Sequence, residues 1–325
     1  MVRLLRSKRP DDKEYTVRIY TLTLNPAYDV HAACDDFAAG YENLAKILSR
    51  EAGGKGVNIS RALQENQIPN TAVIVLGKEN AADFLNDLNK AGMECILLEK
   101  EGRIRENLTL HCENGPETRI SFSGFSVDDS ILAQVENAIK VDDETIITFT
   151  GRVASGMTMD AVKAFLKREQ DRGAKIVLDS KSFGLEDIYE VRPWLIKPNQ
   201  EEITEYFGCL VETVSQGVEK AAVMAARGVE NVMISLGEQG AILVSDGICY
   251  CAVPPKIEAV STIGAGDSTI AGFVAATILG AKPSERLKNA VAFGTAACLT
   301  AGTLPPRQED IQCIYEQVTI RCMEL

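Results

Sequence analysis

Histidine is scarce in this chain of 325 residues, which contains only His31 and His111. Chemistry that needs a histidine base therefore has few candidates. The nine cysteines are scattered and include no C-x-x-C pair, so a zinc site is not expected. Scattered packing cysteines are typical of a reduced environment, and we expect a cytoplasmic protein.

Long apolar runs and an excess of positive charge are also missing. No run approaches the roughly 18 residues that a membrane helix needs, and the formal net charge is -12. Such an acidic surface argues against non-specific binding of nucleic acid or of an anionic membrane. If the ligand is an anion such as phosphate, the positive charge that binds it must therefore lie at the binding site itself.

Two common phosphate-binding fingerprints are absent as well. The glycine-rich segment 53–57 (G-G-K-G-V) lacks the G-x-x-x-x-G-K-[ST] spacing of a P-loop. Gly264 and Gly266 are followed at the third position by Thr269, so G-x-G-x-x-G fails too. The second absence counts against a nicotinamide-dependent dehydrogenase.

The most informative stretch, 260–276 (V-S-T-I-G-A-G-D-S-T-I-A-G-F-V-A-A), passes from a turn into a helix. Backbone N–H groups of Gly264, Ala265 and Gly266, together with the positive end of the helix, would suit an anion such as phosphate. A carboxylate at Asp267 beside an anion is repulsive, and it makes sense if it accepts a proton from a hydroxyl that attacks phosphorus. An N-cap aspartate after a glycine-rich turn explains the residue equally well.

Strand-like and helix-like patterns alternate along the chain. The strand-like runs are 17–24, 71–77, 145–150, 175–179, 194–197, 231–236 and 241–244. The helical patterns occupy 53–63, 81–91, 160–172, 200–207 and 218–227. This alternation predicts an α/β fold with a central, mostly parallel sheet flanked by helices.

Two further runs, 107–112 and 117–122, alternate apolar and polar residues around Asn114-Gly115-Pro116. They predict a β-hairpin with one apolar face. Because a lone hairpin is marginally stable, we expect it to cover an active site or to pack on a second subunit.

An ordered set of motifs links these elements. The motifs are T-L-T-L-N-P at 21–26 with Asp29, G-G-K-G-V-N at 53–58, R-E-N at 105–107, K-P-N at 197–199 with Glu202, S-L-G at 235–237 and G-A-G-D-S at 264–268. In this order and spacing, over about 18–305, the set resembles the PfkB/ribokinase superfamily of sugar kinases. The nearest branch is the 1-phosphofructokinase and tagatose-6-phosphate kinase group.

The resemblance implies a ribokinase-like fold with a small β lid, built from about 27–50 and 103–125, and a reaction that uses ATP and Mg²⁺. It implies that Gly264, Ala265 and Gly266 form the anion hole and that Asp267 is the base. A carboxylate of low pKa would suffice there, because phosphoryl transfer depends mostly on positioning and charge stabilisation. The other implied contacts are the sugar at Asp29, Gly54, Lys55, Asn58 and Asn107, its phosphate at Arg105, Mg²⁺ at Asn199 and Glu202, and the nucleotide at Lys197, Ser235, Gly237, Asn289 and Gly294.

Departures from the family pattern fall on the sugar side. The family's S-G-S-L-P reads T-G-R-V-A at 150–154, so Arg152 replaces a serine that would face the sugar or its phosphate. The threonine before the lid arginine is Ile104, and D-x-S-G reads D-S-K-S at 179–182. Arg152 would suit a sugar phosphate together with Arg105, or it points outward and pairs with a surface carboxylate.

The expected activity is ATP-dependent phosphorylation of a phosphorylated ketohexose, with fructose 1-phosphate to fructose 1,6-bisphosphate as the leading reaction. Alternative substrates are tagatose 6-phosphate, another sugar or a nucleoside. A sugar-phosphate-binding protein without turnover is a rival that the carboxylate beside the anion site argues against.

The chain has no Ser/Pro-rich linker and no internal repeat. We expect that residues 1–17 are not a secretory signal, since they are basic and lack an apolar core. We expect a disordered extension over 1–17, one kinase domain over 18–325 and a homodimer through the apolar face of the lid hairpin.

Overall fold

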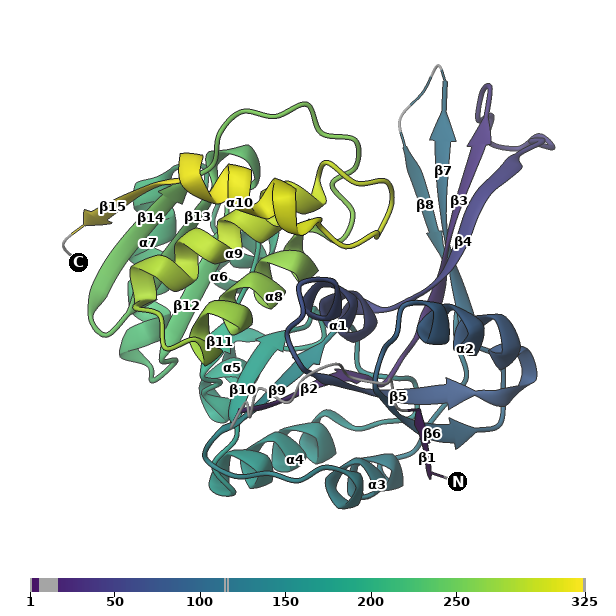
Figure 1. Ribbon diagram of the computed structural model, residues 1–325, viewed down its shortest axis with the longest axis horizontal. Coiled ribbons are helices and arrows are strands. Elements are labelled where there is room, and N and C mark those ends of the chain that lie inside the picture. The colour runs from purple at the N-terminus through teal and green to yellow at the C-terminus, as the bar shows by residue number, and fades with distance from the viewer. Residues whose placement is uncertain (1, 6–16, 114, 116, 324–325) are drawn as a thin grey trace.

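Two β-sheets organise the described residues, which are 2–5, 17–113, 115 and 117–323 of the computed structural model (Figure 1). The larger sheet has eleven strands in the order β1 (Val2–Leu5), β6 (Cys95–Lys100), β5 (Thr71–Gly77), β2 (Arg18–Thr23), β9 (Thr145–Thr150), β10 (Lys175–Asp179), β11 (Leu195–Ile196), β12 (Asn231–Ser235), β13 (Ala241–Ser245), β14 (Ile248–Val253) and β15 (Thr319–Met323). From β6 to β12 the strands pair in parallel, whereas β1 and the strands from β13 to β15 pair antiparallel. The predicted mostly parallel sheet is confirmed.

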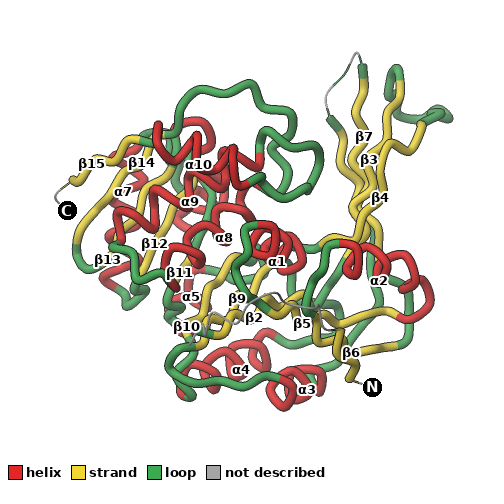
Figure 2. The backbone as a smooth tube through the Cα atoms, in the orientation of Figure 1, coloured by secondary structure: helices red, strands yellow, loops and turns green. Residues whose placement is uncertain are grey.

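Helices cover both faces of this sheet (Figure 2). One layer contains α1 (Lys55–Glu65), α2 (Ala81–Lys90), α8 (Ala265–Ile278), α9 (Pro283–Ala297) and α10 (Gln308–Gln317). The other contains α3 (Ser130–Ala138), α4 (Met159–Asp171), α5 (Leu185–Val191), α6 (Gln200–Phe207) and α7 (Val214–Ala226). Strand β10 shows why both layers are needed, because Ile176 and Leu178 pack into one apolar cluster and Val177 into the other.

The smaller sheet, here called the lid, projects away from the main body (Figure 1). Its strands lie in the order β4 (Lys46–Gly53), β3 (Ala27–Cys34), β7 (Arg105–Cys112) and β8 (Thr118–Ser121). The predicted hairpin is present as β7 and β8, with Leu108 opposite Ile120. Residues 114 and 116 of its turn lie outside the described residues.

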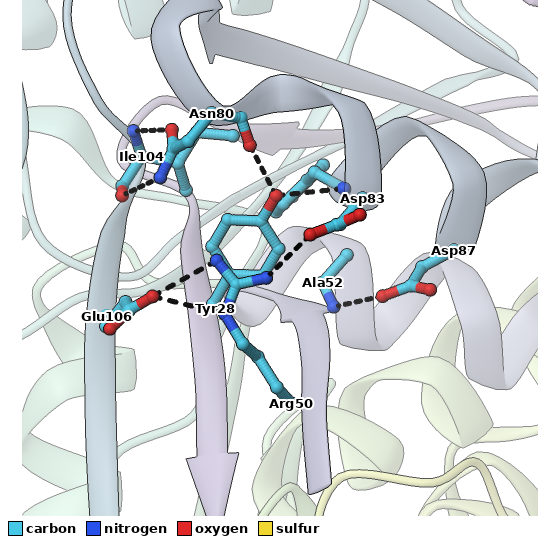
Figure 3. Close-up of polar contacts among 9 residues, drawn as sticks. Tyr28, Arg50, Ala52, Asn80, Asp83, Asp87, Ile104 and Glu106 are labelled. Atoms are coloured by element: carbon cyan, nitrogen blue, oxygen red, sulfur yellow. Dashed lines mark hydrogen bonds and ion pairs between the residues drawn. The ribbon is translucent and has the colours of Figure 1, made fainter.

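The lid is attached to α2 through Tyr28 and Arg50 (Figure 3). The hydroxyl of Tyr28 donates to the Asn80 carbonyl at 2.6 Å and accepts from the Phe84 amide at 2.9 Å. The Arg50 guanidinium lies 3.4 Å above the Tyr28 ring centroid and donates to Glu106 at 3.1 Å. Because neighbours in a strand face opposite sides, Asp29 lies on the face of the lid that points away from α2, where its carboxylate approaches Gly53 before α1.

The predicted extension over 1–17 is described only at Val2–Leu5 and Val17, and the rest of it lies outside the described residues. Val2–Leu5 form strand β1 beside β6, which their composition does not predict. Within the described ranges, no helix is long and apolar enough to cross a membrane.

Candidate active site

Gly264, Ala265 and Gly266, here called the anion turn, open helix α8. Gly264 is the N-cap and has a φ of 78°, a left-handed conformation that favours glycine. A Cβ built on Gly266 would lie 3.2 Å from Nζ of Lys197, so the ammonium group sits directly beside the turn. The N–H group of Ala265 donates to the Thr262 carbonyl at 3.4 Å. The other N–H groups at the start of α8 and the buried ammonium group of Lys197 provide the local positive charge that an anion needs in this acidic protein.

Asp267 follows the anion turn and is only 6% exposed. Its Oδ2 accepts a hydrogen bond of 2.9 Å from the side-chain amide of Asn58 on α1. Burial raises the pKa of Asp267 to about 6, although Lys55, Asn58 and Lys197 oppose the rise. The pKa is therefore raised rather than low, which suits a general base that works near neutral pH.

A second buried carboxylate, Asp179, lies between two lysines. Nζ of Lys55 is 2.8 Å from Asp179 Oδ2, and Nζ of Lys197 is 3.9 Å from Oδ1. Burial alone would raise the pKa of Asp179, but the two ammonium groups outweigh it and hold the pKa below its ordinary value. Asp179 thus remains ionised and positions Lys55, which the sequence predicts only as a sugar contact.

Asp179 is the site residue that the sequence prediction missed as a functional group. The position of Asp179 in the sequence does indicate a functional residue, because Asp179 ends strand β10 at the carboxyl edge of the parallel sheet, where ligands bind. Its partner Lys55 is 124 positions away, and such pairing is not visible in a single sequence.

The lid contributes a polar row from β3 and β7. Asn107 donates from Nδ2 to Asp29 Oδ1 at 3.0 Å and accepts from Arg105 Nη1 at 2.8 Å. Burial raises the pKa of Asp29. A Cβ at Gly53 would collide with the Asp29 carboxylate, so this carboxylate lies directly beside the junction between β4 and α1. The predicted sugar contacts of the lid and of α1 therefore share one region.

Arg152 follows β9, and its side chain is exposed. Within the described part of the chain it has no ion pair, so the alternative of a surface carboxylate partner finds no support. Burial lowers the pKa of Arg105, Asp29 opposes this, and the positive charge of Arg152 lowers it further. Nε of Arg105 is buried without a partner among the described residues. The two guanidinium groups are therefore close enough to repel each other when no anion lies between them.

The predicted magnesium residues form a capping box at the start of α6. The Asn199 side chain accepts from the Glu202 amide at 2.8 Å, and Glu202 Oε2 accepts from the Asn199 amide at 3.0 Å. The other Glu202 oxygen lies 4.0 Å from Nζ of Lys181. Among the described residues no group of three acidic, histidine or cysteine side chains could hold a metal ion. An ion here would rely on water and ligand phosphates.

Apart from Lys197, which lies beside the anion turn, the predicted nucleotide residues divide into two groups. Ser235 ends β12, and a Cβ built on Gly237 meets nothing within 4 Å. The end of β12, here called the nucleotide edge, therefore has free space beside it. Asn289 instead donates to the Gly272 carbonyl at 2.7 Å, and a Cβ at Gly294 would collide with Thr269. These two contacts hold α9 against α8, and the predicted nucleotide contact of Asn289 and Gly294 stays a prediction.

Comparisons with known proteins assign the chain to a family. The family described as pfkB family carbohydrate kinase matches residues 22–310. The 1-phosphofructokinase of Escherichia coli (strain K12) is 30% identical over 282 residues, covering 86% of this chain and 90% of that protein. The 1-phosphofructokinase of Bacillus subtilis (strain 168) is 29% identical over 283 residues, covering 87% and 93%.

Solved structures share the fold of this chain. Phosphofructokinase-2 from Escherichia coli in complex with substrates and products superposes with a TM-score of 0.85 at 26% identity, covering 93% of this chain and 99% of that one. The predicted fold class and the resemblance drawn from the motifs are both confirmed. The chain belongs to the pfkB family of carbohydrate kinases.

Proposed function

We propose that this carbohydrate kinase transfers the γ-phosphoryl group of ATP to fructose 1-phosphate, giving fructose 1,6-bisphosphate and ADP. The observation that carries the proposal is the environment of Asp267, a buried carboxylate beside the anion turn with a pKa raised to about 6. Such a group is mostly ionised above neutral pH and still basic enough to accept a hydroxyl proton. A binding protein without turnover has no use for it.

In the proposed reaction a sugar hydroxyl oxygen attacks the γ-phosphorus, and the bond from that phosphorus to the bridging oxygen of ADP breaks. The hydroxyl proton goes to Asp267. The N–H groups of the anion turn and the ammonium group of Lys197 face the negative charge of the transferred group. This agrees with phosphoryl transfer in general, where the protein mainly positions reactants and stabilises charge.

Mg²⁺ is part of the proposal. Glu202 would hold the ion, since one of its carboxylate oxygens is not used by the capping box with Asn199. A single carboxylate suits Mg²⁺, which usually keeps several waters and binds substrate phosphates. When bound, the ion neutralises phosphate charge.

The substrate assignment rests on Arg105 and Arg152 and on the names of the relatives. Two neighbouring guanidinium groups, neither of them in an ion pair among the described residues, favour a substrate that already carries a phosphate. The relatives named 1-phosphofructokinase support fructose 1-phosphate. Fructose 6-phosphate is a second candidate, because phosphofructokinase-2 from Escherichia coli in complex with fructose-6-phosphate has a TM-score of 0.84 to this chain. Tagatose 6-phosphate is a third.

We also infer a homodimer formed through the apolar face of the lid. Ile47, Ile120 and Phe122 are exposed there, beside the small apolar cluster of Ala32, Cys34 and Leu110. Exposed apolar groups gathered on one sheet face mark an interface. One structural neighbour, phosphofructokinase-2 from Escherichia coli, has a tetrameric inhibited form. A measurement of the mass in solution must therefore distinguish a dimer from a tetramer.

The deciding experiment measures ADP release with ATP and Mg²⁺ over fructose 1-phosphate, fructose 6-phosphate, tagatose 6-phosphate, fructose and adenosine. We expect the highest kcat/KM with fructose 1-phosphate and little turnover of the unphosphorylated compounds. A preference for fructose or adenosine would overturn the substrate assignment. Absence of ADP release with every compound would overturn the proposed kinase reaction on sugar phosphates.

A further inference from the structure

The only two histidines of the chain meet in the lid. Nδ1 of His31 on β3 lies 2.9 Å from Nε2 of His111 on β7, and the rings stack with centroids 5.3 Å apart and an interplanar angle of 12°. Nδ1 of His111 lies 3.4 Å from the Glu117 carboxylate. This chain of contacts fixes the orientation of the buried His31 ring.

The other nitrogen of His31 faces the main body. A Cβ built on Gly302 would lie 3.0 Å from Nε2 of His31, so the loop backbone packs directly on the imidazole. Gly302 has a φ of 58°, a left-handed conformation that side chains disfavour. The loop after α9 therefore touches the lid at Gly302, where both the close contact with His31 and the left-handed backbone favour glycine.

The same loop also borders the anion turn. A Cβ built on Gly264 would lie 3.7 Å from Cα of Thr303. Thr303 is buried, and its hydroxyl has no hydrogen-bond partner among the described residues. The backbone at 302–303 is thus packed between His31 of the lid and Gly264 of the anion turn.

We propose that His31 is a positioning residue that holds the Gly302–Thr303 backbone against the anion turn, and that His111 and Glu117 keep His31 in place. The inference rests on the proposed phosphoryl transfer at that turn. His31 lies two residues after Asp29 on β3, on the same face, so the strand that carries a sugar contact also carries this contact. Placement of the lid over the sugar is thereby linked to the geometry of the anion turn.

The protonation of His31 is consistent with this role. Burial lowers the pKa of His31 and the neighbouring His111 lowers it further, while Asp29, Glu51 and Glu117 act in the opposite direction. A neutral ring can pack on a backbone without introducing a buried charge. The role assigned to His31 is therefore mechanical, and it involves no proton transfer to the substrate.

Three substitutions at His31 separate this role from general structural support. The amide nitrogen of Gln can reach the position of Nε2, whereas that of Asn reaches only the position of Nδ1. We expect His31→Gln to retain most of kcat, and His31→Asn and His31→Ala to lower kcat about tenfold, because loss of the loop contact misplaces the anion turn. The KM for the sugar phosphate should change less than twofold.

A double-mutant cycle tests the contact itself. Gly302→Ala should lower kcat in the wild-type background more than in the His31→Ala background, where its Cβ no longer meets the imidazole. Amide hydrogen exchange of residues 299–305, measured without substrates, should be faster in His31→Ala than in the wild type. Ser49→Ala, opposite His31 on β4, is the matched control and should leave both readouts unchanged.

Equal kcat losses in the Gln and Asn variants, or additive effects of His31→Ala and Gly302→Ala, would overturn the inference. So would an unchanged exchange rate of 299–305 in His31→Ala. The exchange measurement needs no turnover, so it decides the role of His31 even if the proposed substrate is wrong.

Discussion

The side-chain amide of Asn58 donates to Oδ2 of Asp267 at 2.9 Å, and the two residues are 209 positions apart. Asn58 lies in the first turn of α1, and Asp267 lies in the first turn of α8. Because the two helices pack together, their N-terminal ends open towards the same region. The bond therefore joins the sugar-side motif to the anion turn and holds the carboxylate in place.

The first prediction concerns the role of Asp267. Asp267→Asn keeps the shape of the side chain but removes the proton acceptor, so kcat should fall by roughly a thousandfold or more. Binding of the sugar phosphate, measured by calorimetry, should be retained. A variant that keeps more than about a tenth of the wild-type kcat would refute the role of Asp267 as the base.

The second prediction concerns the pH dependence of kcat. With the pKa of Asp267 raised to about 6, kcat should fall as the pH drops through 6, because the protonated carboxyl cannot accept a proton. The hydrogen bond from Asn58 lowers that pKa, so Asn58→Leu should move the acidic limb to higher pH. A sugar phosphate also titrates near pH 6. An acidic limb that does not move in Asn58→Leu would therefore be assigned to the substrate.

The third prediction concerns stability. The pKa of Asp267 is raised from 3.8 to about 6, so the native state holds this proton more tightly than the unfolded state. Its contribution to stability is present below pH 4 and is lost as the pH rises through 6. Asp267→Asn should therefore be more stable than the wild type at pH 8, by up to about 3 kcal/mol. Urea unfolding at pH 8 and pH 4 checks this, and an equal difference at both pH values would contradict it.

Local patterns predicted much of the fold and of the site. The anion turn and Asp267 lie within one contiguous motif. The parallel strands are predicted by apolar runs that alternate with helical patterns. The capping box of Asn199 and Glu202 also has a local signal, an N-x-x-E pattern before a helix, whereas the family resemblance implies only a metal site there.

Features that depend on tertiary packing were not predictable. The raised pKa of Asp267 results mainly from burial, which no local pattern encodes. The pairing of Lys55 with Asp179 and the contact of His31 with Gly302 join segments that are distant in sequence. Strand β1 has only four residues, which is too short to be distinguished from an extension by its composition.

The fourth prediction concerns assembly. Phe122→Lys places a charge on the exposed apolar face of the lid, so it should convert the expected dimer into a monomer because burying that charge is costly. Light scattering at micromolar concentration measures the mass. Lys46→Glu, at the exposed start of β4, is a charge-changing control that should leave the dimer intact. A fully active wild-type monomer would contradict the predicted interface.

The last prediction concerns Arg152. Its guanidinium has no ion pair among the described residues and lies close enough to lower the pKa of Arg105. A substrate phosphate between the two would relieve their repulsion and accept charge-assisted hydrogen bonds from both. Arg152→Ser restores the residue typical of the family and should nevertheless raise the KM for the sugar phosphate about ten- to a hundredfold, since such a bond contributes about 1.5–3 kcal/mol.

The KM for ATP separates this role from a general disturbance of the site. Arg152 follows β9 on the sugar side, away from Ser235 and Gly237 of the nucleotide edge, so Arg152→Ser should leave the KM for ATP within twofold. Arg152→Lys keeps the charge but loses the paired donors, and its KM for the sugar phosphate should be intermediate. An unchanged sugar-phosphate KM in Arg152→Ser, or an equal rise for ATP, would show that Arg152 does not bind the substrate phosphate.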